Sequence, residues 1–285
     1  DGSLFVQGNF TFIDGAAANQ VAKLNSAGHI DGSFVAPVIA STSVNVIRAD
    51  ASGLYLGGAF PDVAGNTGYA NLARLSLSTG AVDASFAPAP NASLRDIALD
   101  STGVYLAGSF SEVAGASRNW VAKVAKADGS LVTGFTAAVP FDSMAVAMTT
   151  DGAGSLWVAG SDSSMGMLMG KLSTTDGAAD SAFSWSGNGT VVALSLDGAG
   201  NLYAVGTFYE FGSFERTKVG SMNAATGAVT AFNPKLIAAG AVYAVAAGPA
   251  GPYLGGTFTS AGGRGVFGLA AIDLSTGEID QTLPG

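Results

Sequence analysis

Residues 54–60 read LYLGGAF, a short apolar strand that runs into Gly-x-Phe, and the same pattern recurs along the whole chain. The copies are Phe5–Phe10, Leu54–Phe60, Tyr105–Phe110, Trp157–Asp162, Tyr203–Phe208 and Tyr253–Phe258. Their aligned glycines, spaced by 50, 50, 52, 46 and 50 residues, are Gly8, Gly58, Gly108, Gly160, Gly206 and Gly256. Such spacing is typical of β-propeller blades or solenoid coils. The sequence therefore contains six repeats, which we number first to sixth.

Each repeat contains short apolar runs, which we name a, b, c and d. In the second repeat they are Val44–Asp50, Leu54–Phe60, Leu72–Leu75 and Val82–Phe86. A glycine stands in every c–d turn, where a tight hairpin needs a positive φ. These glycines are Gly28, Gly80, Gly129, Gly177, Gly227 and Gly277. Prolines follow run d in four repeats, at Pro37, Pro88, Pro140 and Pro234. The pattern predicts one four-stranded antiparallel meander per repeat.

Sheets with two apolar faces must pack against neighbours, and radial repetition allows every repeat to do so. The sequence therefore predicts an all-β, six-bladed β-propeller of four-stranded antiparallel blades, forming a single domain over residues 1–285. A linear β-solenoid is the alternative, but its coils are usually shorter and contain no meander. We expect the propeller because of the repeat length and the number of runs.

Runs b, c and d occur six times, whereas run a occurs five times. The first blade thus lacks its own innermost strand in this sequence. Residues before Asp1, residues after Gly285 or another chain would have to supply it, because an open sheet edge leaves unpaired backbone groups. We favour a chain that continues in the natural protein, and a closed ring would place Asp1 near Gly285.

The second repeat, with LYLGGAF at 54–60, NLARL at 71–75 and GAVDASFAP at 80–88, resembles the bacterial delta-sixty β-propeller repeat family over essentially the whole chain. Fungal cell-polarity proteins have a similar Gly-x-Phe repeat. The resemblance implies an extracellular or surface-attached protein, and it brings no catalytic residues to transfer. The fourth repeat departs from the pattern, because Asp162 replaces the phenylalanine and the b–c loop is shorter.

Composition excludes several classes of partner. The chain has 12 Lys and Arg against 21 Asp and Glu, a net charge of -9, and no cysteine. Without clustered basic residues we expect no nucleic-acid partner and no binding to an anionic membrane surface. No apolar run approaches the length of about 18 residues that spans a bilayer, so we expect no membrane span in this chain. The abundance of Ala, Gly, Ser and Thr resembles that of secreted bacterial surface proteins.

Catalytic and metal chemistry has little support in the sequence. His29 is the only histidine, so a histidine-based triad or zinc site would lack partners, and we expect a solvated turn residue. Asp128, Asp151 and Asp197 could suggest calcium, but each lies in an Asp-Gly turn, where a carboxylate normally accepts hydrogen bonds from local amides. We therefore expect no catalytic residue, no metal site and no cofactor.

Aromatic residues in the b–c loops are the candidate ligand or partner contacts. They are Tyr69, Trp120, Phe214 and Phe267. Stacking on a sugar is one interpretation, and hydrophobic packing within the loop is the other, which we favour. Asn91 and Asn188 also begin glycosylation sequons, which matter in a eukaryotic secretory route.

These features favour a non-enzymatic extracellular or cell-surface protein that acts as a structural scaffold or a protein–protein interaction module, with a protein partner or copies of itself. A glycan-binding, lectin-like propeller is the alternative from another class. A hydrolase or lyase, such as a glycoside hydrolase, comes third, because sequence alone cannot place two carboxylates across a cleft.

Two local patterns give structural predictions. Basic residues in run c register with aspartates in run d, which predicts cross-strand ion pairs on the outer blade edges. The expected pairs are Lys23 with Asp31, Arg74 with Asp83 and Lys171 with Asp180. In the fourth repeat Met165, Met167 and Met169 alternate, so all three should share one face. We expect them to fill the core, with a partner-binding patch as the alternative.

Overall fold

The computed structural model describes residues 2–39, 43–164, 166–236, 240–261, 264–266, 268–273 and 277–280. In these ranges the chain is all-β, with antiparallel strands and one 3₁₀ turn, η1 (Thr67–Tyr69). No helix in the described ranges is long and apolar enough to cross a membrane. The chain divides into two compact units, Asp1–Thr136 and Ala137–Gly285. Each unit holds three repeats, and the single domain stays a prediction.

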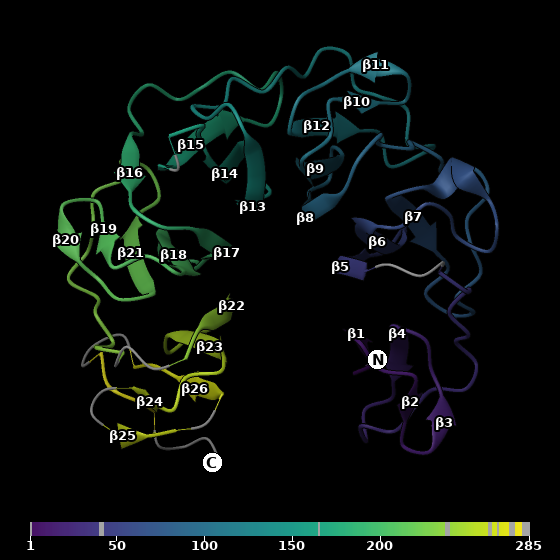
Figure 1. The fold of residues 1–285 in the computed structure, drawn as a ribbon, viewed down its shortest axis with the longest axis horizontal. Helices are drawn as coiled ribbons and strands as arrows, with labels where there is room; N and C mark the ends of the chain where they lie inside the picture. Colours follow the sequence, from purple (N-terminus) through teal and green to yellow (C-terminus); the bar gives the residue numbers. More distant parts are fainter. Residues whose placement is uncertain are drawn as a thin grey trace. The chain divides into compact units, whose positions relative to one another are not determined.

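The first unit contains one main sheet per repeat, and run b is the central strand of that sheet wherever run a is present (Figure 1). The first repeat contains β1 (Leu4–Gln7) and β4 (Val21–Leu24). The second contains β5 (Ser43–Asp50), β6 (Gly53–Ala59) and β7 (Leu72–Leu75). The third contains β8 (Leu94–Leu99), β9 (Val104–Gly108) and β12 (Val121–Val124). As expected, β1 pairs with β4 and no run a strand lies beside it among the described residues.

The second unit repeats the a–b–c order. The fourth repeat contains β13 (Met144–Thr150), β14 (Ser155–Ser161) and β15 (Met167–Ser173). The fifth contains β17 (Val191–Leu196), β18 (Asn201–Gly206) and β21 (Val219–Asn223). The sixth contains β22 (Val242–Ala247), β23 (Pro252–Gly256) and β26 (Leu269–Ala271). Asp1 and Gly285, whose proximity the closed ring predicts, lie outside the described residues.

Run d does not form a fourth strand, which corrects the prediction of four-stranded blades. It makes one β-bridge to run c in each repeat, such as Leu75 with Val82. In the second repeat the Phe86 amide then donates to the Asp83 carbonyl oxygen at 3.2 Å, and the Asp83 carboxylate accepts from the Ser85 amide at 3.0 Å. This turn ends the pairing after one bridge and directs the phenylalanine into the core, where it is fully buried.

Small hairpins in the b–c loops were not expected from the sequence. They are β2 (Phe12–Ile13) with β3 (Ala16–Ala17), β10 (Glu112–Val113) with β11 (Ala116–Ser117), β19 (Glu210–Phe211) with β20 (Phe214–Glu215), and β24 (Ser260–Ala261) with β25 (Arg264–Gly265). In the third repeat the turn residues Ala114 and Gly115 both have positive φ, 52° and 74°. Two-residue turns of this kind join tight hairpins.

The described residues of the fourth repeat form no such hairpin, because the b–c loop is short, and β14 and β15 pair along seven residues each. An additional strand, β16 (Trp185–Gly187), follows run d and pairs with β15 on one side and with β19 of the fifth repeat on the other. The departure of the fourth repeat from the sequence pattern therefore changes how two neighbouring repeats are joined.

In the five repeats that contain run a, the aligned glycine of run b faces a β-bulge in run a. The pairing of β5 with β6 shifts register between Val44 and Val46, and the other a–b pairs shift at the equivalent place. A Cβ at Gly108 would lie 2.2 Å from the carbonyl oxygen of Ser93, a distance that no side chain can tolerate. The repeated glycine is thus required by the close approach of two backbones.

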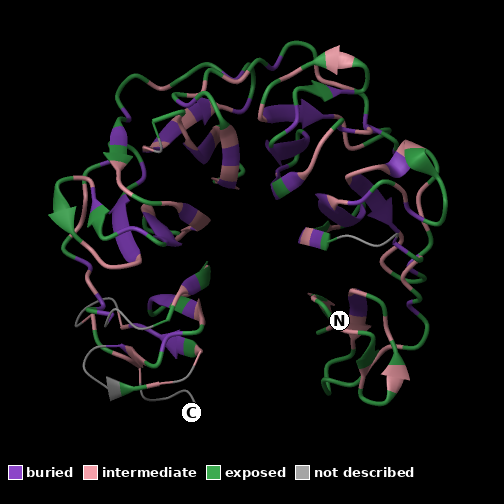
Figure 2. Cartoon of the chain, viewed as in Figure 1, coloured by how far each residue is buried: buried purple, intermediate pink, exposed green. Residues whose placement is uncertain are grey.

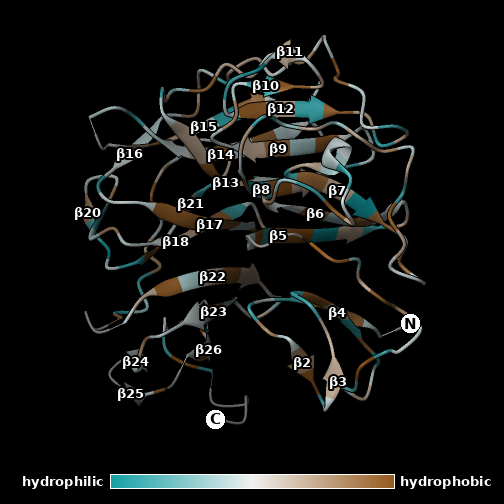
Figure 3. Cartoon of the chain, turned by 45° about the vertical axis from the view of Figure 1, so that its right-hand side comes forward, coloured by the Kyte–Doolittle hydropathy of each residue, from teal (hydrophilic) through white to brown (hydrophobic). Residues whose placement is uncertain are grey.

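The two faces of each sheet pack against different neighbours. In the second repeat, we call the face that contains Leu54 and Leu56 the preceding face. The opposite face, which contains Tyr55 and Leu72, is the following face. The following face of the second repeat and the preceding face of the third repeat form one core. The first and second repeats, the fourth and fifth repeats, and the fifth and sixth repeats share a core in the same way. Buried and hydrophobic residues accordingly concentrate in the strands (Figures 2 and 3).

Two faces differ from this rule. On the following face of the sixth repeat Leu269 is 63% exposed, whereas its equivalent Leu72 is 0% exposed. On the preceding face of the first repeat Leu4 is 59% exposed, whereas its equivalent Leu54 is 0% exposed. Each of these two sheets therefore exposes an apolar face whose equivalent in the second repeat is buried.

The predicted ion pairs are confirmed, with Nζ–Oδ2 distances of 3.2 Å for Lys23–Asp31 and 2.9 Å for Lys171–Asp180, and an Nη2–Oδ2 distance of 2.6 Å for Arg74–Asp83. The basic side chains are more buried than an outer edge would make them, because each lies over an aromatic ring such as that of Phe86. The core role of the methionines is confirmed for Met167 and Met169, which are buried, while Met165 lies outside the described residues.

Candidate functional site

The candidate aromatic contacts have different environments. Tyr69 lies in η1 and is buried in the core between the first and second repeats, so it packs rather than stacks on a ligand. Trp120 is half-buried, and its backbone has a φ of 62°, at a position where the other repeats have Gln20, Asn71 or Lys218 in the same conformation. Phe214 is 50% exposed on β20. Phe267 lies outside the described residues.

The single histidine is a surface residue, as expected. His29 Nδ1 lies 2.7 Å from Asp14 Oδ2, and both side chains are more than half exposed. The Asp128 carboxylate accepts from the Ser130 amide at 2.9 Å within its own turn. Both residues therefore have the local structural roles that the sequence favoured.

The two sequon asparagines hold loops together. Asn91 Oδ1 accepts from the Ser111 and Glu112 amides at 3.0 and 3.1 Å. Asn188 Oδ1 accepts from the Tyr209 and Glu210 amides at 3.1 and 3.0 Å. The same side chain thus fixes the start of the b–c loop in the third and fifth repeats, a structural role that accounts for both residues.

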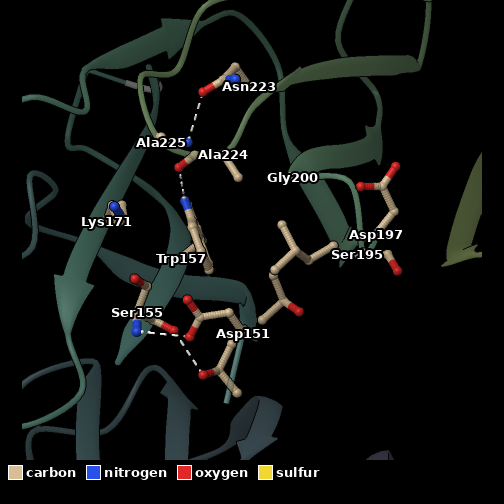
Figure 4. A pocket seen from close by; sticks show the side chains of 14 residues that line it. Asp151, Ser155, Trp157, Lys171, Ser195, Asp197, Gly200, Asn223, Ala224 and Ala225 are labelled. Atoms are coloured by element: carbon tan, nitrogen blue, oxygen red, sulfur yellow. Dashed lines mark hydrogen bonds between the residues drawn. The ribbon is translucent and has the colours of Figure 1, made fainter. Parts of the chain in front are cut away.

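A cleft of about 650 Å³ lies between the fourth and fifth repeats, inside the second unit (Figure 4). The a–b turns of both repeats contribute Asp151 and Asp197, and the c–d turn of the fifth contributes Asn223–Ala225. Trp157 lies between them and donates its indole Nε1–H to the Ala224 carbonyl oxygen at 2.8 Å. This cleft is the candidate functional site, because it brings together polar groups from two repeats.

Both carboxylates of the cleft are held by their own turns. Asp151 Oδ1 accepts from the Ala153 and Ser155 amides at 2.8 and 2.9 Å, and Asp197 Oδ1 accepts from the Ala199 amide at 2.9 Å. Partial burial would raise the pKa of each carboxyl, but the hydrogen bonds outweigh it and hold both pKa values below the ordinary range. The cleft is therefore lined by two ionised carboxylates at neutral pH.

Lys171 also lines the cleft, but its charge is engaged elsewhere. Its Nζ lies 2.9 Å from Asp180 Oδ2 in its own repeat and 5.7 Å from the centre of the Trp157 ring. In the described part of the chain no Lys or Arg forms an ion pair with Asp151 or Asp197. The described residues also contain no group of three His, Cys, Asp or Glu that could hold a metal ion.

Sequence reasoning named Asp151 and Asp197 but did not bring them together or connect them with Trp157. A signal was present, because Trp157 occupies the position that is Tyr55, Tyr105 and Tyr203 in other repeats. Tyr203 donates its hydroxyl to its own a–b turn at Asp197 Oδ2, 3.1 Å away, whereas the indole of Trp157 reaches the next repeat. The replacement of tyrosine by tryptophan in the fourth repeat thus accompanies a different contact with the next repeat.

Fold and cleft together define an all-β protein whose antiparallel sheets repeat along the chain and pack face against face. No family model and no curated protein matches the chain. One hundred solved chains match it in fold. Among them is a chain of the "Crystal Structure of Mitotic Checkpoint Complex", with 12% identity, a TM-score of 0.49, and coverage of 83% of this chain and 80% of that one. The resemblance to the delta-sixty repeat family stays a prediction.

Proposed function

We propose that the six repeats close into one six-bladed β-propeller that serves as a non-enzymatic scaffold or protein–protein interaction module at the cell surface or outside the cell. The uncovered faces support closure, because the following face of the sixth repeat and the preceding face of the first are the two kinds of surface that pack together between consecutive repeats. Mutual burial of Leu4 and Leu269 would remove apolar area from water at both. The abundance of Ala, Gly, Ser and Thr and the resemblance support the location.

The observation that carries an interaction role is the β19–β20 hairpin of the fifth repeat. Tyr209, next to β19, and Phe214, on β20, are both at least half exposed. The Arg216 guanidinium carbon lies 5.5 Å from the Phe214 ring centre, and its Nε–H donates to the Phe232 carbonyl oxygen at 3.1 Å, which fixes the side chain. Aromatic residues and arginine are enriched where proteins bind one another. The hairpin thus offers a pre-organised contact surface.

A photo-reactive amino acid placed at Phe214 tests this role in the native source. We expect it to cross-link one protein partner, or a second copy of this chain, while the same group at the exposed Ser101 yields no such adduct. The double variant Tyr209→Ser and Phe214→Ser should weaken binding of the captured partner by at least about tenfold, the size expected for an aromatic anchor. Equal cross-linking at both positions would contradict the proposal.

A glycan-binding role is the second candidate, favoured by the exposed ring of Phe214 beside Arg216. Among the described candidate aromatics, Phe214 is exposed enough for its ring to stack on a sugar, whereas Tyr69 is buried. A glycan array separates the two roles. Saturable sugar binding that is lost in Phe214→Ser, without any protein partner, would favour the lectin-like alternative.

A further inference from the structure

The contact between the second and third repeats shows how another junction of the chain fills the position of this cleft. There the Asp50 carboxylate, in the a–b turn of the second repeat, forms an ion pair with the Lys126 ammonium from the c–d turn of the third repeat. The guanidinium of Arg74 donates to the carbonyl oxygens of Lys126 and Ala127, the latter at 3.2 Å. Two cations from the chain itself therefore occupy this junction.

The same positions in the fourth and fifth repeats are occupied differently. Asp151 is the equivalent of Asp50, because Asp50 pairs with Gly53, the first residue of β6, and the Asp151 amide donates to the carbonyl oxygen of Ser155, the first residue of β14. Counting back from the c–d glycines Gly129 and Gly227, the equivalent of Lys126 is Ala224. The carboxylate has thus been retained while the lysine has become a methyl group.

The backbone of the junction is nevertheless held in place. The carbonyl oxygen of residue 126 accepts from Arg74, and the equivalent carbonyl of Ala224 accepts from Trp157. The turn therefore stays anchored although the lysine is replaced by alanine. Asp151 lines the cleft of about 650 Å³ that lies at this junction. An alkyl chain and an ammonium group are what the chain places there in the second and third repeats.

We propose that this cleft binds an alkylammonium group, such as a lysine side chain or a free primary amine, with the ammonium on the Asp151 carboxylate in the position that Lys126 takes on Asp50. Asp197 adds a second negative charge, and Lys171 is neutralised by Asp180 within its own repeat. The net charge of -9 also attracts cations to the protein. This site does not depend on ring closure or on the β19–β20 hairpin, so its failure would leave the proposed function intact.

Titration followed by two-dimensional NMR tests the proposal on the whole chain. The probes are n-butylammonium chloride, lysine blocked at both its α-amino and carboxyl groups, and the same blocked lysine acetylated on Nζ, all at equal ionic strength. We expect saturable shifts of the Trp157 indole N–H and of the Ala153 and Ser155 amides with the two charged probes. The acetylated probe should bind at least about tenfold more weakly, because it cannot form a charged hydrogen bond.

Two variants and one control locate the site. Asp151→Asn keeps an acceptor for the turn amides but removes the charge, and Ala224→Lys supplies the ammonium from the chain, so each should weaken binding of blocked lysine at least about tenfold. Asp128→Asn, an exposed turn aspartate elsewhere, should bind as the unaltered protein does. Binding of butylammonium but not of blocked lysine would identify a free amine as the ligand. Binding of both probes would identify a lysine side chain as the ligand. Equal shifts with the acetylated probe, or equal binding by Asp151→Asn, would overturn the proposal.

Discussion

The Arg74 guanidinium donates two hydrogen bonds to Asp83 Oδ2, from Nε at 2.9 Å and from Nη2 at 2.6 Å. Its carbon lies 4.7 Å from the centre of the Phe86 ring, and the side chain is 7% exposed. The pair links run c to the turn that ends run d, so a charge that the sequence suggested for the blade edge in fact lies between two repeats.

Arg74→Met should destabilise the protein by about 2 kcal/mol, because it leaves a partly buried carboxylate without its cation. Lys23→Met is the matched control. It removes one longer contact, 3.2 Å to Asp31, from the first repeat and should have a smaller effect. Urea unfolding of both variants measures the difference. Equal losses would show that the buried position of Arg74 adds nothing.

Gly108→Ala should destabilise the protein by about 3 kcal/mol, the upper part of the range for overpacking, because its Cβ would meet the Ser93 carbonyl oxygen at 2.2 Å. Gly8→Ala is the matched control at the same position of the first repeat, where the added Cβ meets the Phe10 ring at 3.3 Å and no backbone within 4 Å. Thermal unfolding should therefore show a large shift for Gly108→Ala and a small one for Gly8→Ala. The reverse order would refute the role given to the bulge.

Much of this fold follows from the spacing of Gly-x-Phe, because a period near 50 residues and the glycine of every c–d turn determine three strands and their order. Run d could not be assigned from its apolar character alone. The Asp83 to Phe86 turn competes with strand pairing, and its hydrogen bonds end the strand after one bridge. The two-residue strands beside Ala114 and Gly115 are too short for alternation to reveal them.

The cleft was harder to predict, because its residues come from turns of two different repeats. Alignment of the repeats identifies Lys126 with Ala224, but only packing shows that position 224 lies against Trp157 of the preceding repeat. The exposure of the aromatic candidates could not be predicted from the sequence either, because Tyr69 and Phe214 occupy similar loops, yet Tyr69 is buried and Phe214 is exposed.

Asp100 should make stability fall in acid. Partial burial would raise its pKa, but hydrogen bonds from Thr102, Tyr105 and Gly103 outweigh that effect and hold the pKa below the ordinary value of 3.8. A lowered folded-state pKa stabilises the fold above that value, and the contribution is lost as pH falls through the folded pKa. Stability should therefore fall less steeply with acid in Asp100→Asn.

The Tyr105 hydroxyl donates to Asp100 Oδ2 at 2.9 Å, so Tyr105→Phe should give an intermediate slope. Urea midpoints measured from pH 5 downward, in steps of about half a unit, compare the three proteins over the window in which the carboxyl gains its proton. Three parallel curves would mean that the Asp100 network makes no pH-dependent contribution.

Met167→Ala should cost about 2–5 kcal/mol, because the side chain is buried between the fourth and fifth repeats and its loss leaves a cavity. Met167→Leu preserves most of the volume and should cost less than about 1.5 kcal/mol. Denaturant unfolding distinguishes the two. A negligible effect of the alanine variant would contradict the contribution to stability that we assign to Met167.

Closure of the six repeats is tested most directly by cross-linking, for which the chain provides a background with no cysteine. Leu4 and Leu269 take the places that Val104 and Leu72 occupy in the core shared by the second and third repeats. The double variant Leu4→Cys and Leu269→Cys, treated with a short bis-maleimide, should form an intramolecular cross-link whose yield does not depend on protein concentration. Leu4→Cys with Phe214→Cys should not form one. Cross-links that form only between molecules, or equally in both variants, would contradict a closed ring.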